Sequence, residues 1–118
     1  MDYKELDVWK KSIELVETMY KISAKFPSSE VYGLTNQIRR ASASVSSNIA
    51  EGAGRSGDKE LLYFLNVALG SLAEVETQVE IALRLNFIST ADSIFIQITE
   101  VRKLLIGFRN YINKKSNH

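Results

Sequence analysis

The sequence of 118 residues contains no cysteine, only one proline (Pro27) and only one histidine (His118, the last residue). Without cysteine the chain can form neither a disulfide framework nor a thiolate metal site, which fits the cytoplasmic location that we expect. Di-iron helix bundles need a Glu-x-x-His motif on each of two helices, and one terminal histidine cannot supply them. We therefore expect no metal and no cofactor.

Long apolar runs are also missing. No stretch approaches the ~20 apolar residues that span a bilayer, so we expect no membrane segment. The first residues, Met1-Asp2-Tyr3-Lys4-Glu5, are acidic and polar and predict no signal peptide. The formal net charge of +1 gives by itself no reason to expect a polyanionic partner. With 45% hydrophobic and 25% charged residues, the composition predicts one globular domain over residues 1–118.

Apolar residues recur at steps of three and four, which predicts four amphipathic helices at about 5–25, 32–51, 58–86 and 90–113. Pro27 should end the first helix, and the glycines between Gly52 and Gly57 should separate the second from the third. Short joins make neighbouring helices antiparallel, so the expected fold is all-α, an up-down-up-down four-helix bundle.

The expected inward positions of the first helix are Leu6, Trp9, Ile13, Val16 and Tyr20, beside a second stripe of Leu15, Met19, Ile22 and Phe26. Those of the second are Val31, Leu34, Ile38, Ala41 and Val45. Those of the third are Leu61, Leu65, Ala68, Leu72, Val75, Val79 and Ala82, and those of the fourth are Ala91, Ile94, Ile98, Val101, Leu105, Phe108 and Ile112.

Capping residues are available at three helix starts. A serine of Ser28-Ser29 can cap the second helix, Ser56 or Asp58 the third, and Ser89-Thr90-Ala91-Asp92 resembles a capping box before the fourth. The tail from Lys114 onward should lie beyond the last helix.

Small residues dominate the middle of the second helix, Ala41-Ser42-Ala43-Ser44-Val45-Ser46-Ser47. Serine is a mediocre helix former, so tertiary contact must impose the helix, and small side chains let a neighbouring backbone approach. Asn48 falls on the inward stripe, where an asparagine can fix helix register, and Glu51 can pair with Arg39 or Arg55. The structural or interface candidates are Ala41, Ser44, Asn48, Glu51 and Gly52.

Catalytic groups are scarce. No internal histidine is available as a general base, and Glu74, Glu76 and Glu80 are better explained as a solvated acidic face than as metal ligands. The loop Gly52-Ala53-Gly54-Arg55-Ser56-Gly57 lacks the Gly-Lys-Ser/Thr ending of a phosphate loop and follows a helix. We therefore expect no enzyme, with an anion site at Arg55 and the start of the third helix left open.

Basic residues offer the main binding candidates. Asp58 to Asn86 holds five acids and two bases, whereas Ser89 to His118 holds two acids and five bases. Arg39 should flank the core and the adjacent Arg40 should be more exposed. Either arginine can contact a phosphate or a subunit, or can pair with the acidic third helix. The candidate nucleic-acid contacts are Arg39, Arg40, Arg55, Lys59, Arg102, Lys103 and Arg109.

Several motifs give the sequence a family resemblance: Tyr32-Gly33-Leu34, Gln37-Ile38-Arg39-Arg40-Ala41, Asn48-Ile49-Ala50-Glu51-Gly52 and Gly70-Ser71-Leu72-Ala73-Glu74-Val75-Glu76. Together with Leu6-Asp7-Val8-Trp9-Lys10 and Phe26-Pro27, they resemble the bacterial four-helix bundle proteins called 23S rRNA intervening-sequence proteins. The resemblance covers nearly the whole chain. It implies a homopentamer around a central channel and no catalytic residues. A relative, the accessory variability determinant of retroelements, binds nucleic acid and a reverse transcriptase through a basic surface.

Two functions follow as hypotheses. The first is a pentameric accessory factor that binds RNA or DNA phosphates through the basic set. The second is a protein-interaction scaffold without nucleic acid, in which small residues of the second helix and a stripe of Leu62, Leu69 and Leu83 bury partner surface. A small-molecule enzyme is a distant third. A continuous basic surface favours the first hypothesis, and arginines paired with Glu51, Glu74, Glu76 or Glu80 favour the second.

Overall fold

The computed structural model describes residues 1–117 and consists of helices and turns, with no strand in that range. The four helices are α1 (Asp7–Ser23), α2 (Leu34–Ala53), α3 (Asp58–Arg84) and α4 (Asp92–Ser116). Two short 3-10 turns, η1 (Tyr3–Glu5) and η2 (Ser28–Glu30), precede α1 and α2. The predicted all-α fold with four helices is confirmed. The start of α3 is as predicted, and the other helix bounds differ from the prediction by two or three residues. His118 lies outside the described residues.

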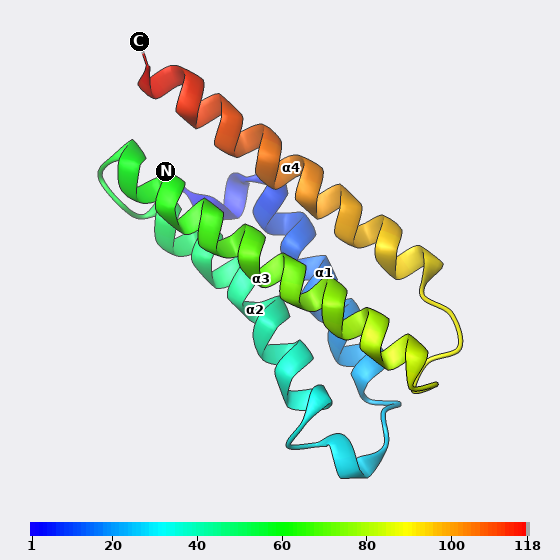
Figure 1. Cartoon of the computed structure of the whole chain (residues 1–118). Helices are drawn as coiled ribbons and strands as arrows, with labels where there is room; N and C mark the ends of the chain where they lie inside the picture. Colours follow the sequence, from blue (N-terminus) through cyan, green and yellow to red (C-terminus); the bar gives the residue numbers. More distant parts are fainter. Residues whose placement is uncertain (118) are drawn as a thin grey trace.

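The helices pack side by side in the cyclic order α1, α2, α3, α4, in an elongated bundle of 50 × 24 × 20 Å (Figure 1). Contacts between neighbouring helices run in opposite senses. Along α4, Arg102 contacts Glu76 of α3, and Lys115, further along, contacts Asp58 at the start of α3. Figure 1 shows the α1–α2 and α3–α4 joins at one end of the bundle, which we call the lower end, and the α2–α3 join at the other.

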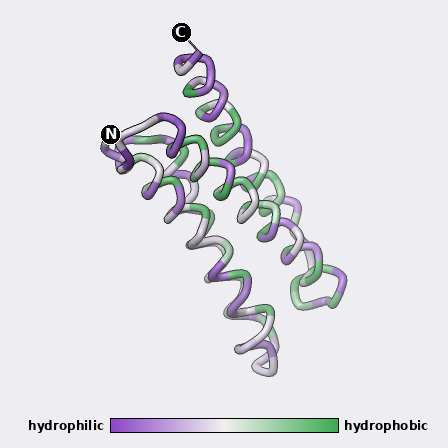
Figure 2. Tube along the Cα trace, turned by 60° about the vertical axis from the view of Figure 1, so that its left-hand side comes forward, coloured by the Kyte–Doolittle hydropathy of each residue, from purple (hydrophilic) through white to green (hydrophobic). Residues whose placement is uncertain are grey.

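The core follows the predicted pattern closely on α3 and α4. All seven inward positions predicted for α3 are buried, and on α4 only Phe108 is partly exposed. Figure 2 shows how hydrophobic and hydrophilic residues alternate along each helix with the period of a turn. The hydrophobic effect of this one cluster therefore holds all four helices together.

The inward face of α1 differs from the prediction. Tyr20 is 46% exposed, whereas Ser12 and Ser23 are buried beside Leu15 and Met19. A serine can occupy a core position when its hydroxyl is hydrogen-bonded. Ser12 Oγ donates to the carbonyl oxygen of Trp9 and lies 2.9 Å from Ser46 Oγ of α2. Of the predicted stripe, Leu6 and Trp9 pack against the core, Ile13 and Val16 are half-buried, and Tyr20 is exposed, so the stripe lies at the edge of the buried face. Val31, predicted as an inward position of the second helix, lies before α2 and is 51% exposed.

The helix ends also depart from the predicted caps. Neither α3, which follows Gly57, nor α4, which follows Ala91, has a side-chain capping bond. At α2 the N-cap is Gly33 rather than a serine, and the backbone nitrogen of Leu34 donates to Oε1 of Glu30 at 3.2 Å. α4 continues through the polar tail to Ser116, whose hydroxyl bonds Asp58 of α3.

α2 and α3 form the most extensive helix pair of the described chain. Ser44 Oγ and Ser71 Oγ are 2.9 Å apart across this pair. A Cβ added at Gly52 would lie 2.9 Å from Cβ of Phe64 and 3.1 Å from Cδ1 of Leu61. The small residues of α2 therefore bring the two helices close, as the sequence predicts. None of the helices within residues 1–117 has the length and apolar character of a membrane span.

Candidate interaction surface

A polar hollow of about 400 Å³ opens between the outer sides of α2 and α3. Gln37, Arg40 and Ala41 line it from α2, and Ser71, Glu74 and Gln78 line it from α3. The hydrogen-bonded hydroxyls of Ser44 and Ser71 also line this hollow. Arg40 and Glu74 bring a positive and a negative charge into one shallow site.

Three groups in this hollow lack partners within residues 1–117. The side-chain oxygen Oε1 of Gln78 is fully buried and accepts no hydrogen bond. Arg40 and Glu74 are both exposed, and neither forms an ion pair with the acids and bases of the described chain. A buried carbonyl oxygen without a donor costs about 1–3 kcal/mol, so Gln78 needs a donor from outside the chain or from a rearranged neighbour.

Three more hollows continue this one across α3 to α4. The first shares Gln37, Glu74 and Gln78 with the polar hollow and adds Gly70, Thr77 and Ile81. The next, of about 470 Å³, shares Thr77 and Ile81 and reaches Phe95, and the last extends from Phe95 over Ile96 to Lys103. We call the four together the α2–α3–α4 surface. It is polar at α2 and largely apolar around Phe95.

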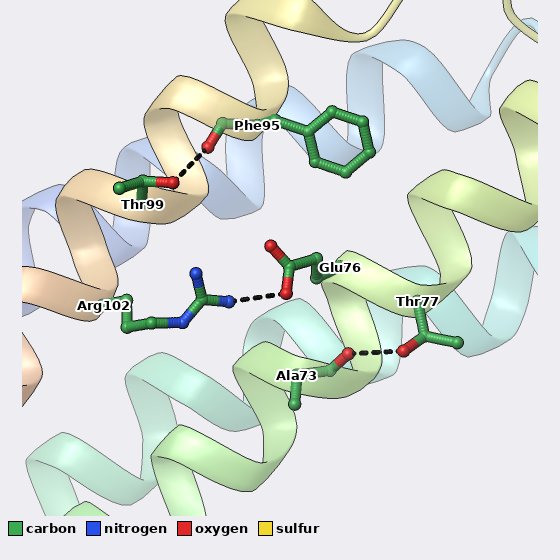
Figure 3. A network of polar contacts seen from close by, with 6 residues as sticks. All are labelled: Ala73, Glu76, Thr77, Phe95, Thr99 and Arg102. Carbon is green, nitrogen blue, oxygen red and sulfur yellow. Dashed lines mark hydrogen bonds and ion pairs between the residues drawn. The ribbon is translucent and has the colours of Figure 1, made fainter.

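The seam between α3 and α4 within this surface is shown in Figure 3. Nη2 of Arg102 on α4 donates to Oε1 of Glu76 on α3 at 2.8 Å. Phe95 lies two turns before Arg102 on the same helix, and Figure 3 shows its ring directed from α4 towards α3, apart from the ion pair. Thr99 and Thr77 donate their hydroxyls to carbonyl oxygens of their own helices. The hydroxyls of both threonines and the guanidinium of Arg102 already have partners in the chain. The side chains that remain for contact with another molecule are those of Phe95, Ile81 and Ile96.

Arg39 and Arg40 point to different neighbours, as their 100° separation predicts. Arg39 is half-buried and binds α1: its Nε donates to Ser23 Oγ at 2.8 Å and its Nη2 to the carbonyl oxygen of Tyr20. Its guanidinium also lies 4.6 Å from the ring centroid of Tyr20. The predicted pairing of Arg39 with the acidic third helix, or with Glu51, is therefore wrong. Arg40 is the exposed one, as predicted.

Arg55 and Lys59 lie near the α2–α3 join. Arg55 forms an ion pair with Glu51, one turn earlier, and its Nη1 lies 3.7 Å from Glu60 on α3. Its guanidinium also stacks over the ring of Phe64. Because Glu51 and Glu60 compensate the charge of Arg55, the anion site considered at this helix start has little remaining attraction for phosphate. Lys59 is exposed and forms no ion pair within residues 1–117.

The bases of α4 are spread along the helix. Arg102 is paired with Glu76, and Arg109 donates to Asn66 Oδ1 of α3 at 3.4 Å. Lys103 is exposed at the edge of the α2–α3–α4 surface. The seven predicted contacts therefore do not form one basic patch in a single chain: Arg39 faces α1, Arg55 and Arg102 are paired with acids, and the others are separated.

The structural candidates make contacts within the chain. Asn48 Nδ2 donates to the carbonyl oxygen and the hydroxyl of Ser44, which ties it to the α2–α3 seam. Leu62, Leu69 and Leu83 are half-buried against the chain's own core, and their contact with a partner stays a prediction. No group of three potential metal ligands occurs within residues 1–117.

Gly70, Gln78 and Phe95 were not among the predicted site residues. Gly70 and its motif were visible in the sequence, and a glycine in the middle of a long helix is itself a signal. No sequence pattern marks Phe95, because only the pairing of α3 with α4 shows which apolar residues remain at the surface.

The polar hollow contains parts of two of the sequence motifs, Gln37 to Ala41 and Gly70 to Glu76. Comparison with known proteins agrees with these motifs. Residues 4–107 match the family described as 23S rRNA-intervening sequence protein. The chain belongs to this family. Its structure is also similar to the crystal structure of a protein of unknown function from the S23 ribosomal protein family of Bacteroides thetaiotaomicron VPI-5482. The TM-score is 0.77 at 27% identity, over 86% of this chain and 97% of that one. No curated protein matches the chain significantly.

Proposed function

We propose that this 23S rRNA-intervening sequence protein is a non-catalytic bacterial assembly subunit that binds further copies of itself through the α2–α3–α4 surface. Five copies is the number that the family resemblance implies. The main support is that four shallow hollows join into one surface across three helices. This surface is polar around Arg40 and apolar around Phe95. A broad surface with an apolar part and a polar part fits a protein partner better than a small molecule in an enclosed pocket.

Exposed apolar side chains support the same proposal. Ile96 is 63% exposed and Ile81 is 41% exposed, and both lie on this surface. Single apolar residues at a surface are ordinary, but contiguous ones around a hollow mark interaction sites. Burying them in an assembly removes their apolar area from water.

The variant Ile96→Asp tests this proposal, because it places a charge in the apolar part while the core remains intact. Tyr111→Asp is the matched control, since Tyr111 is 62% exposed on the same helix and lines none of the four hollows. Light scattering should give a smaller particle for Ile96→Asp and an unchanged particle for Tyr111→Asp. Equal masses for the wild type and both variants would refute the proposed surface.

Nucleic-acid binding is the second candidate function. Its support is that Arg40, Lys59 and Lys103 are exposed and form no ion pair with the acids of residues 1–117. Several copies in one particle would repeat these charges, and binding would be to phosphate and strongly salt-dependent. Fluorescence anisotropy with a single-stranded RNA should then show an affinity that falls steeply between about 50 and 200 mM salt, as is usual for phosphate contacts. No measurable affinity at low salt would end this candidate.

A further inference from the structure

We propose that the assembly is built by packing the outer edge of α2 in one copy against the outer edge of α3 in the next, with Arg40 bound to the next copy's Glu74 and Gly70 at the point of closest approach. This inference rests on the proposed function and specifies the contact by which it is carried out. The partner is a second copy of this chain. The contact is head-to-tail, because each copy uses two different edges.

The charges of the two edges are complementary. α2 carries Arg39, Arg40 and Glu51, and Arg40 is its exposed base without a partner in the described chain. α3 carries five acids and two bases, and Glu74 is the acid that points outward beside Gly70 and Thr77. Glu76 and Glu80 pair with Arg102 and Arg84, so Glu74 is the acid on this stretch of α3 that is left for a neighbour.

The heights of Arg40 and Glu74 along the bundle also match. The bond between Ser44 and Ser71 places these two serines at one height. Arg40 lies about one turn below Ser44 on α2, and Glu74 lies about one turn below Ser71 on the antiparallel α3. Rotation about an axis parallel to the helices keeps every residue at its own height. In a ring of parallel bundles, Arg40 of one copy therefore faces Glu74 of the next.

Gly70 supplies independent evidence for close approach. Glycine inside a helix is unfavourable relative to alanine, and it is retained where a backbone or ligand needs the space. A Cβ added at Gly70 would meet nothing within 4 Å among residues 1–117. The fold of one copy therefore gives no reason for this glycine. At the matching height the outer edge of α2 presents Ala43 and Ser47, which are small enough to pack against it.

The same heights place an exposed aromatic residue against the apolar hollow. Tyr32, just before α2, is 94% exposed, and Val31 beside it is 51% exposed. Both belong to the α1–α2 join, which lies at the lower end of the bundle together with the α3–α4 join (Figure 1). Ile81, near the end of α3, and Phe95, near the start of α4, line the hollow of about 470 Å³. Tyrosine often anchors protein interfaces because its ring is buried while its hydroxyl finds a polar partner. Arg40 and Tyr32 of one copy and Gly70 of the next would therefore all lie in the same contact between copies.

Charge reversal and mixing test the pairing. Arg40→Glu alone and Glu74→Arg alone should each weaken assembly at least tenfold, because each places like charges in contact. Mixing the two variants should restore the contacts between unlike chains, detected by energy transfer between differently labelled chains. The carboxylate introduced in one variant then meets the guanidinium introduced in the other. A ring of five retains one junction between like chains, so the recovery of assembly should be partial. An ion pair inside one chain would instead be restored only in the double variant and not by mixing.

Substitution of the glycine tests the close approach. Gly70→Leu should weaken assembly at least tenfold with the helical content of the chain unchanged. Gly107→Leu on α4 is the matched control, because a Cβ there also meets nothing within 4 Å, and it should assemble as the wild type does. Assembly of Gly70→Leu at wild-type strength, or failure of mixing to restore the charge variants, would overturn this inference while the proposed self-assembly stands. A wild-type chain that never assembles would overturn both.

Discussion

Gly52 on α2 lies so close to Phe64 on α3 that a Cβ at residue 52 would be 2.9 Å from the phenylalanine Cβ. Real Cβ atoms do not approach one another this closely, and the neighbouring contacts are a leucine methyl and a backbone oxygen of the same helix. The two helices must therefore separate to accept any side chain. This contact fixes the spacing of α2 and α3 near the join between them.

Gly52→Ala should lower the free energy of unfolding by about 1–3 kcal/mol, as overpacking usually does. Gly54→Ala is the control, because its Cβ would meet atoms no closer than 3.6 Å. The control should change the free energy of unfolding by less than about 0.5 kcal/mol. Urea unfolding followed by circular dichroism measures both. Equal stabilities of the two variants would contradict the tight contact.

The buried serine pair between α1 and α2 should behave non-additively. Ser12→Ala leaves the Ser46 hydroxyl buried without a partner and should cost about 1–3 kcal/mol. Ser46→Ala should cost less, because the Ser12 hydroxyl keeps its bond to the Trp9 carbonyl oxygen. The double variant should be no less stable than Ser12→Ala alone. Costs that simply add in a double-mutant cycle would show that the two hydroxyls do not interact.

Substitutions of the adjacent residues Arg39 and Arg40 should have different effects, one on folding stability and the other on assembly. Arg39→Met removes two hydrogen bonds and the contact with the Tyr20 ring, so it should destabilise the folded chain by about 1–3 kcal/mol. Arg40→Met should leave the unfolding of dilute, separated chains within about 0.5 kcal/mol of the wild type. It should weaken assembly instead. The opposite assignment, with Arg40 needed for folding, would contradict the structure.

The ion pair of Arg102 and Glu76 should be worth little in isolation. Their side chains are 31% and 41% exposed, and pairs of this kind contribute about 0.2–1 kcal/mol. A double-mutant cycle of Arg102→Met and Glu76→Gln should give a coupling energy in this range that shrinks as salt is added. A coupling that does not respond to salt would mean that the pair is more deeply buried than the structure shows.

Much of the fold could be predicted from the sequence, because Leu65, Leu72 and Val79 on α3 repeat at helical spacing and are all buried. The inward face of α1 could not, because Ser12 and Ser23 look like surface residues until their partners on α2 are known. The same limit applies to the site. Arg40 and Gly70 were visible as motif residues, but only the pairing of α2 with α3 places them beside Glu74 and Gln78.

The basic set shows the limit of reading charges along a sequence. Arg55 and Arg102 looked available to phosphate, yet each has a carboxylate partner. Which acid reaches which arginine depends on the helix pairing, and charge patterning alone does not provide it. The paired arginines therefore favour association between copies over phosphate binding.

The mass of the purified chain in solution tests the account most directly. One chain has a mass of 13.3 kDa. Light scattering should give a discrete multiple of this mass, five-fold for the ring implied by the family, unchanged by nuclease treatment or by high salt. A mass of one chain at every concentration, or a larger particle that disappears with nuclease, would contradict self-assembly through the α2–α3–α4 surface.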